Sequence, residues 1–160
     1  MMPCHFGPAD RPLLGIYHEP AGAPRAAAIL MCYPIAHEYM SAHPAFRDLA
    51  TALAREGYAV LRFDYWTTGD SSGDQSEATL EQWEASVDLA AAELKDMSGA
   101  SGLSVIGARF GATLAARYAT RARLRDLVLW DPVTNGAAYL AGLRRLHNAR
   151  LAKRRGTPVK

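Results

Sequence analysis

Residues 107–111 read G-A-R-F-G, and they stand between an apolar run at Leu103–Ile106 and an alanine-rich stretch that begins at Phe110. The short apolar run predicts a strand covered on both faces, and the alanine-rich stretch predicts a helix. The two glycines suit a tight strand-to-helix turn, because a Cβ at either position would collide with the neighbouring strand or helix. Such a turn raises its central side chain, here Arg109, above the edge of the sheet.

The same alternation of strand and helix extends through the whole chain. Apolar runs predict strands covered on both faces at Ala26–Tyr33, Ala59–Phe63, Leu103–Ile106 and Leu127–Trp130, and a shorter strand at Leu13–His18. Helical spacing predicts helices at His43–Arg55, with Pro44 in its first turn, and at Leu80–Lys95, Phe110–Arg121 and Ala137–Arg155. Thr79 and Gln82 form a capping-box pattern before the second helix. The predicted fold class is therefore α/β, with a mostly parallel sheet, helices on both faces and a first short strand able to add an antiparallel edge.

Charge divides the chain unevenly. The 160 residues, 49% of them hydrophobic and 21% charged, are typical of a globular domain, and the net charge of +2 favours no nucleic-acid partner. Residues 137–160 hold seven basic residues and no acid, whereas residues 1–136 hold eleven basic against sixteen acidic residues, a net −5. We therefore predict an acidic core at residues 1–136 and a basic lid-like helix and tail at residues 137–160.

The cellular setting and the cofactor content follow from simple counts. No run of about 18 apolar residues is present, and Met1–Asp10 has neither the basic head nor the apolar stretch of a secretory signal. Cys4 and Cys32 form no disulfide framework, which favours a cytoplasmic protein. Asp64 and Asp70 have no His or Cys at ligand spacing, so we predict no metal and no cofactor.

Four stretches of the chain together resemble the α/β-hydrolase superfamily. The likeness is to its serine-aminopeptidase-like branch and, within that branch, to the exosortase A system-associated hydrolases. The stretches are C-Y-P-I-A-H-E-Y-M (Cys32–Met40), L-R-F-D-Y-W-T-T-G-D-S-S-G (Leu61–Gly73), I-G-A-R-F-G-A-T-L-A (Ile106–Ala115) and L-W-D-P-V (Leu129–Val133). The resemblance covers about Leu13 to Leu146 and implies the N-terminal part, roughly the first half, of a three-layer α/β-hydrolase fold. It also implies an ester, amide or thioester hydrolase associated with exopolysaccharide export.

The resemblance assigns roles to residues of the site. It places the oxyanion-hole amides in the loop of Ile35, Ala36 and His37 and at Phe110, which makes these residues and Arg109 the candidate ligand-binding positions. It makes the G-A-R-F-G turn the nucleophile elbow, where a hydrolase has Ser, Cys or Asp.

The usual catalytic triad is incomplete in this sequence. Asp131 is the candidate acid, and the only later histidine, His147, stands sixteen residues on and not where the family has its triad histidine. Because a guanidinium with a pKa above about 12 is no nucleophile, the sequence excludes serine-hydrolase chemistry through the elbow.

Two residues of the candidate site keep alternative interpretations. Arg109 either pairs with Asp131 or Asp64 at a neighbouring strand end, or joins the helix N-terminus in holding an anionic ligand, a carboxylate or phosphate. His37 is either a catalytic acid, base or donor, or an ordinary loop histidine.

For five other residues a structural role is favoured. We expect Ser71 and Ser72 to cap and turn the chain, Cys32 to be an inert core thiol, and Trp66 and Trp130 to be core or pocket wall.

The basic helix predicted at Ala137–Arg155 also has more than one interpretation. Leu140, Leu143, Leu146 and Leu151 follow one side of it, among arginines. It is either a lid helix, a surface for homo-oligomer formation, or a contact for an acidic partner or an anionic membrane surface. Three functions stay open: a hydrolase that takes a small acyl ligand as substrate, a non-catalytic relative that binds an anionic ligand in the same pocket, and an interaction module completed by a second chain.

Overall fold

The computed structural model describes residues 1–155, and it contains one six-stranded sheet and four α-helices within them. The strands are β1 (Met2–Phe6), β2 (Leu13–His18), β3 (Ala27–Cys32), β4 (Ala59–Phe63), β5 (Gly102–Ala108) and β6 (Leu127–Trp130). The helices are α1 (His37–Arg55), α2 (Leu80–Ser98), α3 (Phe110–Ala119) and α4 (Gly136–Arg155), with a short 3₁₀ helix at Gln75–Glu77.

The strands lie in the order β1-β2-β4-β3-β5-β6. β4, β3, β5 and β6 are parallel to one another, whereas β1 and β2 are antiparallel additions beside β4. In the centre of the sheet Leu30 of β3 pairs with Leu61 of β4 on one side and with Val105 of β5 on the other. All three residues are buried, as expected of strands covered on both faces. The predicted α/β class with a mostly parallel sheet is confirmed.

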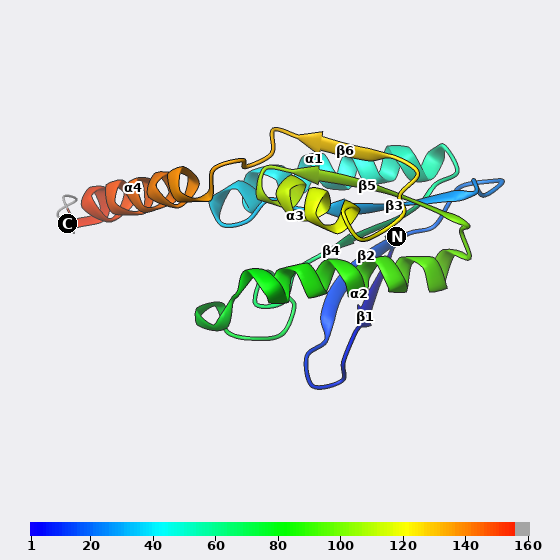
Figure 1. Ribbon diagram of the computed structural model, residues 1–160, viewed down its shortest axis with the longest axis horizontal. Helices are drawn as coiled ribbons and strands as arrows, with labels where there is room; N and C mark the ends of the chain where they lie inside the picture. Colours follow the sequence, from blue (N-terminus) through cyan, green and yellow to red (C-terminus); the bar gives the residue numbers. More distant parts are fainter. Residues whose placement is uncertain (156–160) are drawn as a thin grey trace, which may run out of the picture.

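The helices cover the sheet from both sides, as Figure 1 shows. The chain moves along the sheet in one direction from β3 to β4 and in the other direction from β4 through β5 to β6. Because crossovers between parallel strands are right-handed, this reversal puts α1 on one face and α2 and α3 together on the other. α2 and α3 pack against each other, and α1 packs against β4 and β2.

The N-terminal half departs from prediction in two places. β1 was not expected, because its sequence is short, contains Pro3 and is mostly exposed, which only an edge strand tolerates. β2 is therefore not the edge of the sheet but lies between β1 and β4. α1 begins at His37 and not at His43, so Pro44 stands inside the helix, where its missing N–H leaves one backbone carbonyl without its usual donor.

The prediction that β6 is covered on both faces is wrong. All four of its residues are exposed, with Trp130 63% accessible, although their apolar character is that of a buried strand. Within residues 1–155 no strand pairs with the outer edge of β6, which makes it the open edge of the sheet.

α4 extends away from the sheet (Figure 1). Asn135 caps its start, because the side-chain oxygen accepts a hydrogen bond from the amide of Ala138 at 3.0 Å. Leu140, Leu146 and Leu151 are exposed along it. No helix of residues 1–155 has the length and apolar character that crossing a bilayer requires. The tail predicted after this helix, residues 156–160, lies outside the described part.

Candidate functional site

The elbow of the sequence forms at the end of β5. Arg109 has φ 54° and ψ −122°, a backbone conformation that residues with a Cβ rarely adopt. Both flanking glycines are required: a Cβ at Gly107 would lie 2.6 Å from the Cα of Ala112, and a Cβ at Gly111 would lie 2.2 Å from the carbonyl oxygen of Tyr33. The strained turn therefore exists as predicted, and it presents a guanidinium at its top.

Two carboxylates hold that guanidinium from opposite sides. Arg109 Nε donates to Glu38 Oε1 at 3.0 Å, and Nη1 donates to Asp131 Oδ2 at 2.6 Å and to the Asp131 carbonyl at 3.2 Å. The hydrogen bond that Arg109 donates to Glu38, more than any other contact, raises the pKa of Arg109 above its ordinary value. The predicted ion pair with Asp131 is present, whereas Asp64, the other predicted partner, binds elsewhere.

Tyr139 of α4 packs against the elbow and contacts three of its neighbours. Its hydroxyl donates to Glu38 Oε2 at 2.7 Å, its ring stacks on Phe110, and the guanidinium carbon of Arg109 lies 5.9 Å from its ring centroid. Burial first and the hydrogen bond to Glu38 second raise the pKa of Tyr139, so the phenol stays protonated at neutral pH. We name the four residues Arg109, Glu38, Asp131 and Tyr139 the elbow clamp.

The predicted oxyanion loop lies beside the elbow, because β3 and β5 are neighbours and both end at this edge. The strand order reverses here, which is where α/β folds bind ligands. Ala36 has φ 57° and precedes α1 without a capping side chain, and His37 is the first residue of that helix. Ile35 is half-buried against the core, and Phe110 opens α3, where first-turn amides have no intrahelical partner.

A groove runs from the elbow along α1 on the uncovered side of β5 and β6. Its volume is about 630 Å³, within the range of ligand pockets. Phe46 and Leu49 of α1 form one wall, Ala108 and Trp130 of the sheet form the other, and Arg109 lies at one end. We call this the elbow groove. Trp130 is thus a pocket wall, one of the two roles predicted for it, whereas Trp66 is buried.

The remaining predicted polar residues are structural. Asp64 accepts hydrogen bonds from the hydroxyl of Tyr39 at 2.8 Å and from the amide of Asp70 at 3.0 Å, so it fixes the loop after β4 and does not reach Arg109. Ser71 donates to the Asp64 carbonyl at 2.7 Å, the turn role predicted for it. Ser72 Oγ is buried and has no hydrogen-bond partner in residues 1–155.

The remaining candidates for a reactive site in residues 1–155 are the two cysteines and groups of metal-ligating side chains. Cys4 and Cys32 are free thiols, and complete burial raises the pKa of Cys32 to about 12, which makes it an inert core thiol as predicted. Residues 1–155 contain no group of three or more His, Cys, Asp or Glu side chains placed to hold a metal ion.

Sequence reasoning missed two members of the elbow clamp. Glu38 stands next to His37 in a quoted stretch, and its place in the segment that follows a predicted parallel strand was the signal that could have found it. Tyr139 is 101 residues from Glu38, and no local pattern indicates that contact. His147 lines a cavity that His37 also lines, and neither histidine belongs to the clamp.

Neither a protein-family model nor a curated protein matches the sequence. Solved structures, in contrast, do match the fold of this chain. A lidless α/β serine hydrolase from Xanthomonas campestris matches with a TM-score of 0.68 and 21% identity, over 80% of this chain and 59% of that one. An α/β serine hydrolase homologue from Coxiella burnetii gives 0.65 and 18%, over 80% and 61%. A Pyrococcus furiosus esterase gives 0.65 and 22%, over 82% and 49%.

The chain spans about half to three fifths of the length of these structures. At such low identity the likeness concerns the fold alone. The chain therefore has the fold of the α/β serine hydrolases.

Proposed function

We propose that this chain is a non-catalytic relative of the α/β serine hydrolases that binds a small acyl ligand in the elbow groove. The observation that carries the proposal is the elbow clamp. Arg109 occupies the position of the nucleophile, and its Nε and one Nη1 hydrogen are bound to Glu38 and Asp131. A guanidinium supplies no attacking electron pair at neutral pH, and its charge is already balanced by two carboxylates.

The shape of the groove supports an acyl ligand. Its lining is largely apolar, with polar groups gathered at the elbow end, which suits a short hydrocarbon chain whose polar head lies near Arg109. The amides of Ala36 and Phe110 lie at the same end, where an oxyanion-hole-like pair would donate hydrogen bonds to a carbonyl oxygen. The resemblance to exosortase A system-associated hydrolases favours an acyl compound of exopolysaccharide production as the ligand.

Two measurements test the proposal. Wild-type protein and the Arg109→Ala variant are expected to hydrolyse p-nitrophenyl butyrate at the same background rate, and neither is expected to form an adduct with a fluorophosphonate. Octanamide, a neutral acyl compound, is expected to shift the NMR signals of the amides of Ala45 and Trp130. Ala45→Trp fills the groove and should abolish those shifts, whereas the matched control Ala92→Trp, on the exposed side of α2, should keep them. A burst of p-nitrophenol or a covalent adduct contradicts the loss of catalysis, and unchanged shifts in Ala45→Trp contradict the ligand site.

The free thiols support a cytoplasmic location within this proposal. Cys32 is buried in the core and Cys4 is half-buried at the sheet edge, and the two form no disulfide.

A second candidate function is self-association, and the exposure of β6 favours it. A strand with four exposed apolar residues and an open edge is a template for pairing with another strand. The opposite charges of residues 1–136 and 137–160 make a second copy of this chain a suitable partner, and the exposed leucines of α4 extend the surface. We infer that Val128→Lys lowers the sedimentation coefficient of the associated protein to that of a monomer. Met40→Lys, an exposed apolar position away from β6, should not change it, and a wild-type monomer at all concentrations rejects the idea.

A further inference from the structure

A second cavity lies between α4 and the start of α1, and it is separate from the elbow groove except that His37 lines both. Its volume is about 500 Å³. We call it the helix cavity. Its polar lining consists of His37, the first residue of α1, and of Arg144, His147, Asn148 and Arg150 from α4.

The lining is positively charged on balance, because it holds two guanidinium groups and no carboxylate. Arg109, the arginine of the elbow, is by contrast neutralised by Glu38 and Asp131. Within residues 1–155, Arg144 and Arg150 have no such ion pair. Positive charge that converges on a cavity without a protein counter-charge favours an anion there.

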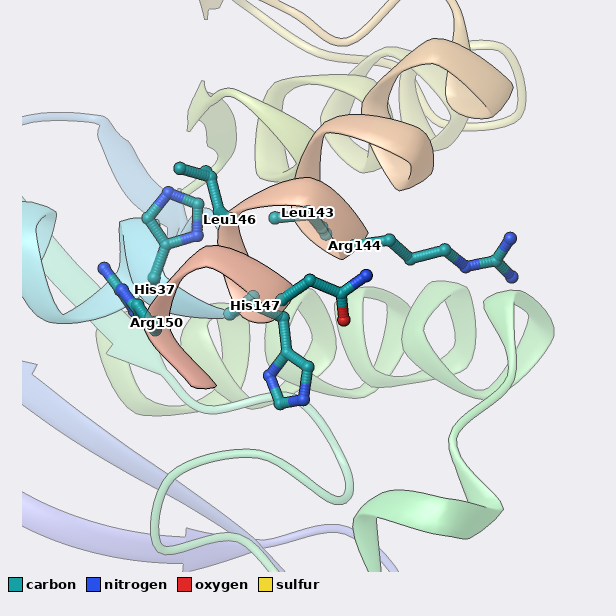
Figure 2. A pocket seen from close by; sticks show the side chains of 8 residues that line it. His37, Leu143, Arg144, Leu146, His147 and Arg150 are labelled. Carbon is teal, nitrogen blue, oxygen red and sulfur yellow. The ribbon is translucent and has the colours of Figure 1, made fainter. Parts of the chain in front are cut away.

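The side chains are arranged to meet a ligand from two parts of the chain. Figure 2 shows His37 and Arg150 at one end of the helix cavity, while Arg144 extends toward the other end. Leu146 contributes an apolar surface beside His37. A ligand in this space would therefore contact the loop before α1 and the second half of α4 together.

We propose that the helix cavity binds a phosphorylated small molecule, with the phosphoryl group held by Arg150 and His37. The guanidinium of Arg150 can donate two parallel hydrogen bonds to phosphate oxygens, and Arg144 adds a second positive charge to the lining from the other end of the cavity. The volume exceeds that of a phosphate group and leaves room for the organic part of the ligand beside Leu146. This site does not rest on the acyl ligand proposed for the elbow groove.

Titration with inorganic pyrophosphate tests the site, with calorimetry for affinity and NMR for location. The wild-type chain is expected to bind one pyrophosphate saturably at about 0.15 M salt, with shifts at the amides of His37 and Leu146. Arg150→Ala should weaken binding at least tenfold, as the loss of a charge-assisted pair does. Arg145→Ala is the matched control, because it removes the same charge from the same exposed helix at a position that does not line the cavity. It should change the affinity less than twofold.

Three outcomes overturn the proposal. One is the absence of saturable pyrophosphate binding. Another is equal weakening by Arg150→Ala and Arg145→Ala, which means that the helix attracts anions only by its overall charge. The third is sedimentation with phosphatidylglycerol vesicles by a chain that does not bind pyrophosphate, which assigns the basic helix to a membrane surface. Circular dichroism of both variants confirms that α4 is intact, so that a loss of binding refers to the side chain alone.

Discussion

Replacing Arg109 by glycine and by alanine separates backbone strain at the elbow from the ion pairs of its side chain. Both variants lose the same contacts with Glu38 and Asp131, so those losses cancel when the two are compared. The backbone at φ 54° and ψ −122° is disfavoured for any residue with a Cβ, by about 1–3 kcal/mol. We therefore expect the glycine variant to be more stable than the alanine variant by about 1–2 kcal/mol, or about 2–8 °C in Tm for a chain of this length.

The assay is urea unfolding followed by tryptophan fluorescence, with Arg117 as the matched position. Arg117 lies within α3 and also pairs with a carboxylate, that of Glu84. Its backbone is helical, so glycine there should be less stable than alanine by about 0.5–1 kcal/mol, the opposite sign. An alanine variant at position 109 that equals or exceeds the glycine variant in stability would show that the backbone of the elbow is not strained.

Three further outcomes are expected. Gly111→Ala places a Cβ 2.2 Å from a backbone oxygen that cannot move aside, so it should destabilise the chain by about 3 kcal/mol or prevent folding. Gly136→Ala is the control, because the space around Gly136 is open, and it should change the free energy of urea unfolding by less than about 0.5 kcal/mol. Burial and Arg62 lower the pKa of His18 from 6.5 to about 4, so the unfolded chain alone takes up this proton between those values. Stability should therefore be full above about pH 6.5, fall by about 3 kcal/mol toward pH 4, and lose most of that dependence in His18→Gln. Thr79→Ala removes the cap of α2 and should cost about 1 kcal/mol by the same assay, with no loss contradicting the capping box.

The sequence predicted well those features that depend on local pattern. β4 and β6 end where their apolar runs end, and the capping box of Thr79 and Gln82 is formed as its spacing indicates. The elbow was predictable because two glycines and an intervening raised side chain are a local steric requirement. Asp131 could be chosen as a partner of Arg109 because both follow neighbouring parallel strands.

Features set by tertiary contact were not predictable in the same way. The start of α1 was missed because Ala36 has no side chain that caps a helix, while Pro44 imitates a first-turn residue. The exposure of β6 was missed because apolar periodicity records which residues can be buried and not what covers them. Tyr139 joined the clamp through a contact across most of the chain, which only the folded arrangement supplies.

The attachment of α4 has a consequence for its dynamics. Tyr139, in the first turn, supplies the hydrogen bond and the ring contacts that join this helix to the body, while the leucines farther along are exposed. Amide deuteration of those later turns should thus proceed by fraying of the helix, far faster than in the central strands, whose opening requires global unfolding. A bound anion that bridges His37 and Arg150 would slow this exchange. The deuteration rate of the later turns of α4 would then report whether the helix cavity is occupied.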